Sequence, residues 1–288
     1  VEAEGLAGVA AAPPPTPLSA RLLPFQRQGI AQMLRWRGRA LLADEPGLGK
    51  TLQALGVLAA LRPWPVLIVA PATLRLMWAE EVEQWLGLAP AELLVISHAT
   101  DALDQRAPLP RVVVTSFRMA TMLRTQLDAV AWGMVVVDES HALGATSRPT
   151  DAQHTEAIAA LCARAPHTLL LSGTPSLRRP FQLWRQAELV APGLLGTTKW
   201  DFGREYCSQL PGRWGGAPLG AGTRDWELHL LLRCALMVRR RKVDVMGELP
   251  RKRRQWLRVP VAAYTAEARE VEGVEGVEGA EEGEGGEA

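Results

Sequence analysis

The chain has few cysteines and no long apolar run, and so lacks the features that are typical of secreted and membrane proteins. Its 288 residues include only three cysteines, Cys162, Cys207 and Cys234, which are scattered and have no paired spacing. This pattern predicts neither a disulfide framework nor a zinc site, and it is typical of a reducing compartment. No apolar run reaches the ~18 residues of a membrane-spanning helix, and the start of the chain lacks the basic and apolar stretches of a signal peptide. We therefore expect no membrane partner.

Net charge is also nearly absent, but the charges are unevenly distributed. The formal net charge is +1, and nine glutamates and one arginine lie from Glu267 onward. The part before this tail carries 31 basic and 22 acidic residues, a balance of +9. A basic body predicts a polyanionic partner, although basic surfaces are common. The Ala/Pro-rich residues 1–18 and the Glu/Gly-rich residues 262–288 are predicted to be disordered.

Between these ends, short apolar runs alternate with amphipathic segments. Buried strands are predicted at 41–43, 66–69, 93–96, 112–114, 134–137 and 169–171. Helices between them include 74–86 and 117–127. The alternation predicts an α/β fold, with a parallel sheet covered by helices on both faces. We assign residues 19–177 to this lobe and residues 178–261, which are rich in Trp and Arg, to a helical extension.

A phosphate-binding loop is predicted where the strand at 41–43 ends. Two glycines allow positive φ and a close approach to an anion, and the helix behind them directs free N–H groups at phosphates. Lys50 would add a charge at the β- and γ-phosphates, and the Thr51 hydroxyl suits Mg²⁺. The predicted ATP-binding residues here are Gly47, Leu48, Gly49, Lys50 and Thr51. The full pattern has a glycine where Asp44 stands, and a Gly-rich turn before a core helix is the alternative interpretation.

An acidic pair follows the apolar run 134–137, which is typical of a parallel strand covered on both faces. The Asp138 carboxylate can hold Mg²⁺ directly or through water. Glu139 is placed to orient and deprotonate an attacking water. Alone, this pair would be read as a solvated turn. With a phosphate loop upstream it predicts the catalytic trio Lys50, Asp138 and Glu139, assembled at the strand ends of an open sheet.

Further motifs surround these two. In chain order the seven segments are 23–29, 44–51, 69–74, 114–117, 138–141, 171–175 and 237–245. Together they resemble the Swi/Snf-like ATPases of helicase superfamily two over residues 22–261, and the resemblance implies a RecA-like lobe. Details at 138–141, 179–180 and 206–207 are most similar to the annealing-helicase and fork-remodelling branch.

The resemblance implies roles for individual residues. Gln26 would hydrogen-bond the adenine edge. Residues that couple ATP hydrolysis to DNA contact would be Ser172, Gly173 and Thr174. Residues on the DNA side would be Pro71, Thr73, Thr115 and Ser116. The implied activity is DNA-dependent ATP hydrolysis with ATP and Mg²⁺, the implied partner is duplex or forked DNA bound without sequence specificity, and the implied location is the nucleus.

Several features leave alternatives open. Family members need a second RecA-like lobe, and the 27 residues after Val261 are too few for one, so we expect that lobe to be missing from this chain. A truncated, non-catalytic fragment that binds ATP or DNA is therefore an alternative, and another class of P-loop enzyme is a third. Pro46, where the family usually has Met, has no N–H to offer a phosphate. The basic runs 239–242 and 251–254 belong either to the folded brace or to a nuclear import signal.

Overall fold

The computed structural model describes residues 17–101, 103, 108–146, 148, 150–176, 180–208 and 220–249. Contacts divide the chain into a unit Val1–Glu248 and a unit Leu249–Ala288, and the fold below is that of the first. The predicted acidic tail and the basic run 251–254 lie outside the described residues. At the other end, helix α1 (Pro17–Arg21) includes Leu18, which is fully buried, so regular structure begins two residues inside the segment 1–18.

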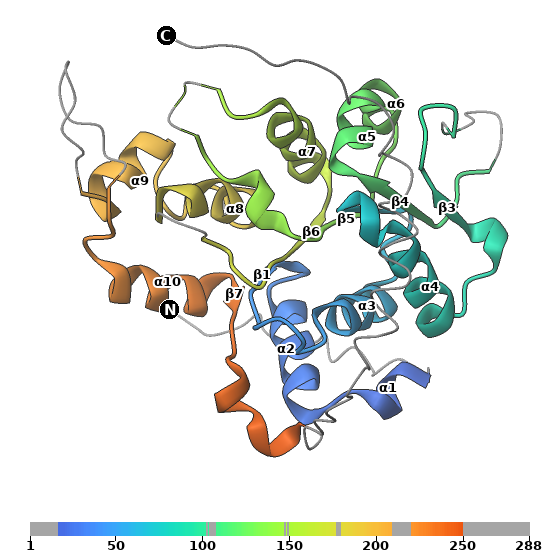
Figure 1. The fold of residues 1–288 in the computed structure, drawn as a ribbon, viewed down its shortest axis with the longest axis horizontal. Helices are drawn as coiled ribbons and strands as arrows, with labels where there is room; N and C mark the ends of the chain where they lie inside the picture. The colour runs from blue at the N-terminus through green and yellow to red at the C-terminus, as the bar shows by residue number, and fades with distance from the viewer. Residues whose placement is uncertain are drawn as a thin grey trace, which may run out of the picture. The chain divides into compact units, whose positions relative to one another are not determined.

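The described strands form one sheet in the order β3-β4-β2-β5-β6-β1-β7, and every pairing is parallel (Figure 1). The strands are β1 (Arg39–Leu42), β2 (Val66–Ala70), β3 (Leu93–Val95), β4 (Val112–Ser116), β5 (Met134–Val137), β6 (His167–Leu171) and β7 (Met237–Val238). The predicted parallel sheet is confirmed. Strand β7 was not predicted: it belongs to the segment assigned to the helical extension, yet it pairs with β1.

The longer helices follow the predicted alternation. They are α2 (Pro24–Arg35), α3 (Lys50–Leu61), α4 (Arg75–Leu86), α5 (Phe117–Met122), α6 (Arg124–Asp128), α7 (Gln153–Arg164), α8 (Leu183–Val190), α9 (Lys199–Tyr206) and α10 (Asp225–Ala235). The helix predicted at 117–127 is two helices, because the backbone at Leu123 leaves the helical conformation.

Alternate residues of each strand enter two separate cores, as the two-residue period of a strand requires. Leu42 and Val136 pack with α1 to α4 on one face. Leu41 and Val135 pack with α5 to α10 on the other. Figure 1 shows the two helix layers on either side of the sheet. Helices on both faces, as predicted, explain why these strands are mainly apolar.

The topology decides which loops meet. Strands β5, β6 and β1 are neighbours, so the segments after their carboxyl ends lie side by side. Those segments are the acidic pair, the predicted coupling motif and the phosphate loop, with the coupling motif in the middle. Strands β2 and β4, which precede the predicted DNA-side residues, lie in the other half of the sheet. In the described part of the chain, no helix is long and apolar enough to cross a membrane.

Candidate active site

The loop after β1 has the geometry of an anion cradle. Gly47 and Gly49 have φ of 86° and 70°, in the left-handed region that favours glycine. Helix α3 begins at Lys50, so its first N–H groups and positive dipole end face the loop. The Lys50 ammonium donates to the Asp44 carbonyl oxygen at 3.0 Å and therefore lies across the loop. Thr51 follows in the first turn of α3.

Lys50 lies in the field of the acidic pair on β5. Burial lowers the pKa of Lys50 below its ordinary value, and the nearby Arg239 guanidinium acts in the same direction. Glu139 and Asp138 oppose this shift by favouring the ammonium form. The two motifs that the sequence separates by 88 residues thus form one electrostatic site.

Gln26 lies against the phosphate loop rather than on an open surface. Its Oε1 accepts from the Leu23 N–H at 2.9 Å, which caps α2, and its Nε2 donates to the Leu48 carbonyl at 3.2 Å. A Cβ at Gly49 would lie 2.4 Å from Gln26 Nε2, so only glycine permits this approach. Gln26 is therefore a loop neighbour, and its predicted contact with adenine remains a proposal.

Asp44 anchors the start of the loop. The residue is fully buried; its Oδ1 accepts from the Arg240 backbone N–H at 2.8 Å, and its Oδ2 accepts from Gln53 Nε2 at 2.9 Å. Burial raises the pKa of Asp44, and the hydrogen bond from Gln53 and the charge of Arg240 oppose that rise only in part. Asp44, which replaces the glycine of the full pattern, therefore links the loop to the segment after β7.

The acidic pair is held by its own backbone and by a tryptophan. Asp138 Oδ1 accepts from the Glu139 N–H at 2.9 Å, and Oδ2 accepts from Trp78 Nε1 at 2.9 Å. Glu139 itself has φ of 49°, an uncommon conformation for a residue other than glycine. Such strain persists where the surroundings impose it and is frequent at functional sites.

A histidine joins the acidic pair to the coupling motif. His141 Nδ1 lies 3.1 Å from Glu139 Oε2 and 3.1 Å from Ser172 Oγ. Ser172 is fully buried, and its Oγ also accepts from the Thr174 N–H at 3.2 Å. A continuous line of polar contacts therefore leads from the Glu139 carboxylate to the turn after β6.

The coupling motif also contacts the phosphate loop. A Cβ at Gly173 would lie 2.8 Å from Pro46 Cγ and 3.5 Å from Lys50 Nζ. Glycine is therefore required at 173 by the close approach of the Pro46 ring. The sequence left the effect of Pro46 undecided, and the structure gives this residue a packing role between the two loops.

Two arginines that follow β7, Arg239 and Arg240, are part of this site. Arg239 Nη1 donates to the Ala43 carbonyl at 2.7 Å and to the Gly173 carbonyl at 3.3 Å. The Arg240 guanidinium donates to the Phe25 carbonyl and lies 5.3 Å from the centre of the Phe25 ring. Of the two interpretations of residues 239–242, the structure supports the folded brace.

The predicted DNA-side residues lie at the ends of two neighbouring strands, β2 and β4, and differ in exposure. Thr73 is exposed and Pro71 is half-buried, at the start of the segment after β2. Thr115 and Ser116 are buried at the end of β4, and Ser116 Oγ accepts from the Met119 N–H at 3.3 Å to cap α5. Both residues are buried in this structure, and their contact with DNA stays a prediction.

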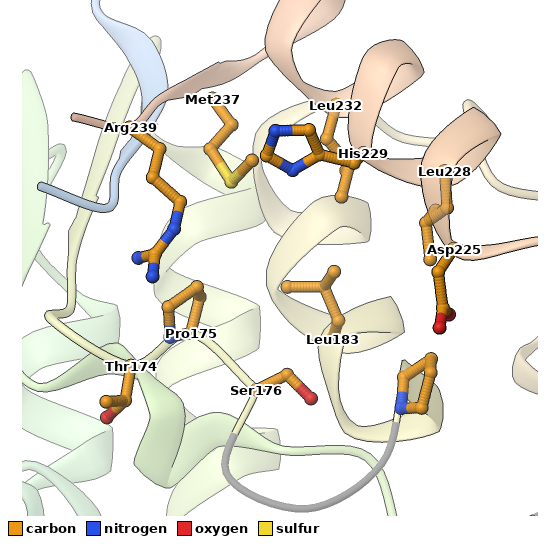
Figure 2. Close-up of a pocket in the computed structure, with 11 residues that line it drawn as sticks. Thr174, Pro175, Ser176, Leu183, Asp225, Leu228, His229, Leu232, Met237 and Arg239 are labelled. Atoms are coloured by element: carbon orange, nitrogen blue, oxygen red, sulfur yellow. The ribbon is translucent and has the colours of Figure 1, made fainter. Parts of the chain in front are cut away.

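A pocket of about 290 Å³ lies beside the coupling motif. Figure 2 shows Thr174, Pro175 and Ser176 on one side, with His229 of α10 and Arg239 opposite. Because Arg239 also binds the Ala43 and Gly173 carbonyl groups, the pocket wall and the phosphate loop share one side chain.

Sequence reasoning missed the positioning residues. Trp78 was given no individual role, because a tryptophan at helical spacing is most often a core residue. Its position eight residues after the end of β2 was the signal that could have placed it near the carboxyl ends of the strands. His141, Asp44, Arg239 and Arg240 all lie in quoted motifs, but their partners are distant in sequence and only the sheet order brings them together.

Residues 25–270 match the family model of the SNF2-related domain. The chain is 37% identical over 268 residues to the human DNA annealing helicase and endonuclease ZRANB3, covering 89% of this chain and 24% of that protein. It is 36% identical over 254 residues to the SWI/SNF-related matrix-associated actin-dependent regulator of chromatin subfamily A-like protein 1 of Xenopus tropicalis, covering 88% and 26%. The chain thus spans about a quarter of the length of these relatives.

A solved structure has the same fold. It is the SWI2/SNF2 ATPase core of Sulfolobus solfataricus in complex with double-stranded DNA, with a TM-score of 0.64 and 22% identity, over 80% of this chain and 47% of that one. At this identity the likeness concerns the fold alone. The resemblance inferred from the motifs is confirmed by the family model, which covers most of the chain: the chain belongs to the SNF2-related, Swi/Snf-like family of helicase superfamily two.

Proposed function

We propose that this chain is the first lobe of an ATP-dependent DNA translocase, of the annealing-helicase or fork-remodelling type, which binds Mg-ATP and duplex or forked DNA. The observation that carries the proposal is the meeting of Lys50, Glu139 and Ser172 at the carboxyl ends of three neighbouring strands. His141 lies within 3.1 Å of the latter two. The positive charge of Lys50, which would bind phosphate groups, therefore lies beside Glu139, which can act as a general base. Ser172 links both to the turn after β6.

The residues present fit a nucleotide and a magnesium ion. The backbone from Gly47 to Thr51 would hold the phosphate groups, and Lys50 would add a positive charge there. Gln26 would hydrogen-bond the adenine ring. The Thr51 hydroxyl and the Asp138 carboxylate are the hard oxygen ligands that Mg²⁺ takes alongside phosphates and water. When bound, Mg²⁺ would neutralise charge on the phosphate oxygens.

The chemistry of the chain itself centres on Glu139. Its carboxylate would take the proton of the attacking water. His141 connects the charge of Glu139 to Ser172, and Ser172 holds the Thr174 N–H. A change of charge at Glu139 would therefore shift the turn after β6, which is how we propose that hydrolysis is coupled to DNA.

DNA binding is supported by the relatives and by charge. The human relative is named as a DNA annealing helicase, and the archaeal core was solved with double-stranded DNA. The exposed Thr73 and the neighbouring Pro71 are the more accessible candidates for backbone contacts. Phosphate contacts predict an affinity that falls steeply with salt and is insensitive to sequence. The name of the Xenopus relative, a regulator of chromatin, supports a nuclear location.

The test combines nucleotide binding with ATP hydrolysis, each with and without forked DNA. Lys50→Ala should abolish tight ATP binding, whereas Arg35→Ala, which removes an exposed charge from α2, should leave it unchanged. DNA-stimulated hydrolysis that is lost in Lys50→Ala would support the translocase lobe. ATP binding that depends on Lys50 but is not followed by DNA-stimulated hydrolysis would support the phosphate loop and contradict the translocase activity. Unchanged ATP affinity in Lys50→Ala would refute the phosphate loop as well.

A further inference from the structure

The segment after β7 runs alongside the phosphate loop. The N–H groups of Leu41, Ala43 and Glu45 donate to the carbonyl groups of Leu236, Val238 and Arg240 at 2.8, 2.7 and 3.0 Å. This parallel ladder extends beyond β1 and β7 into the loop itself. Residues that are almost 200 positions away in sequence are therefore fixed beside the loop by backbone hydrogen bonds.

The chain turns where this ladder ends. The Lys242 N–H donates to Glu45 Oε2 at 2.7 Å, and a short 3₁₀ helix begins there. The side chain of Arg241 pairs with Asp244 at 2.9 Å, so its charge is already matched. The Lys242 side chain extends over the loop instead. A Cβ built on Gly47 would lie 3.6 Å from Lys242 Nζ and 3.7 Å from its Cε.

Lys242 brings a positive charge to a surface that already attracts anions. The residue is exposed, and among the described residues no carboxylate forms an ion pair with its ammonium. Lys50, by contrast, lies in the field of Asp138 and Glu139. The loop is therefore bordered by two lysines, one close to the acidic pair and one above Gly47.

We propose that Lys242 is a second phosphate-binding lysine, whose ammonium contacts the terminal phosphate groups of a nucleotide on the loop. The inference rests on the proposed function and adds to it a ligand residue from outside the loop. The Glu45 carboxylate and the backbone hydrogen bonds hold Lys242 in this position. A nucleotide bound by Lys242 would therefore contact the segment after β7 directly.

The test measures equilibrium binding of ATP, ADP and AMP by the full chain and four variants. In Lys242→Ala the dissociation constant for ATP should rise about tenfold, the lower end of what a hydrogen bond to a charged group contributes. AMP affinity should not change, because AMP lacks the terminal phosphates. Lys242→Arg should retain most of the ATP affinity. Arg241→Ala, which removes the neighbouring charge, should stay within about twofold of the unmodified chain, since it alters only an exposed ion pair.

Three results would overturn the inference. ATP affinity unchanged in Lys242→Ala but lost in Lys50→Ala would refute the role of Lys242 and leave the proposed function standing. Equal losses for ATP and AMP would mean a disturbed loop and no phosphate contact. ATP affinity unchanged in both lysine variants would refute the proposed function as well. Lys242 is exposed, so its substitution should leave the thermal midpoint unaltered, which checks that each variant is folded.

Discussion

The Asp44 carboxylate, which stands where a phosphate-loop pattern has glycine, accepts a hydrogen bond from the Arg240 backbone N–H at 2.8 Å. The Arg240 guanidinium lies 3.6 Å from the same oxygen. One buried acid thus links the start of the loop to the end of the lobe. The unusual residue in the motif is a structural anchor, and its removal should be felt in stability.

Asp44→Ala should lower the free energy of unfolding by about 3 kcal/mol, because the Arg240 backbone N–H loses its acceptor and the half-buried Arg240 guanidinium loses its carboxylate partner. Urea denaturation followed by circular dichroism measures this. Asp244→Ala removes a carboxylate from the exposed pair with Arg241 and should have little effect. Similar losses in the two variants would show that the Asp44 anchor contributes nothing special.

Gly173→Ala should weaken ATP binding about tenfold, since overpacking of this kind costs ~1–3 kcal/mol. The new methyl group would lie 2.8 Å from Pro46 Cγ and push the phosphate loop away. Fluorescent-nucleotide titration measures the change.

A matched control and a rescue sharpen this result. Gly247→Ala should be neutral, because no atom lies within 4 Å of its added Cβ. Removing the ring in the double variant Pro46→Ala/Gly173→Ala should restore most of the affinity. If the double variant binds no better than Gly173→Ala, the contact with Pro46 is not the cause.

Trp78→Phe should raise the Mg²⁺ concentration needed for half-maximal ATP binding by about tenfold, the lower end of the effect of losing an outer-shell hydrogen bond. A smaller aromatic ring remains in the core, but the Asp138 carboxylate loses the N–H that donates to it at 2.9 Å. A Mg²⁺ titration at fixed ATP provides the measurement.

Trp85 is the internal control for that experiment. It lies on the same helix, and its Nε1 donates to Glu81 Oε2 at 2.7 Å, a bond of the same type outside the site. Trp85→Phe should leave the Mg²⁺ requirement unchanged. Equal shifts in the two variants would assign the effect to packing of α4 rather than to Asp138.

Asp151 should make the lobe sensitive to acid. Burial alone would raise the pKa of Asp151, but hydrogen bonds from the Thr146 N–H, Lys199 and Arg185 outweigh it and hold the pKa below its ordinary value of 3.8. A lowered pKa in the folded state means that the carboxylate stabilises the fold above pH 3.8 and that this stability is lost as the pH falls toward the lowered pKa.

Asp151→Asn removes the contribution of Asp151 to the pH dependence of stability. The variant should be less stable at pH 7, by about 3 kcal/mol, and its free energy of unfolding should fall less steeply below about pH 4 than that of the unmodified chain. Asp128→Asn, at a partly exposed pair with Arg124, is the matched control. Parallel pH profiles for Asp151→Asn and the unmodified chain would exclude Asp151 as the acid-sensitive group.

Most strands and the phosphate loop could be predicted from the sequence, because the signals for them lie in neighbouring residues. The runs at 66–69 and 134–137 predict strands by their apolar content, and they correspond to β2 and β5. The left-handed glycines of the phosphate loop and the start of α3 at Lys50 also follow from neighbouring residues. The two-residue β7 carries no such signal, because its pairing with β1 depends on a residue almost 200 positions away.

The sequence by itself determined most of the strands and helices and the candidates for chemical function, because periodicity and motif spacing act over a few residues. Only the tertiary structure decided which of them meet. The order β5-β6-β1-β7 brings Glu139, Ser172, Lys50 and Arg239 to one edge, and it buries Thr115 and Ser116 elsewhere. The physical reason is that side-chain contacts and burial arise from packing between elements distant along the chain, which no local pattern records.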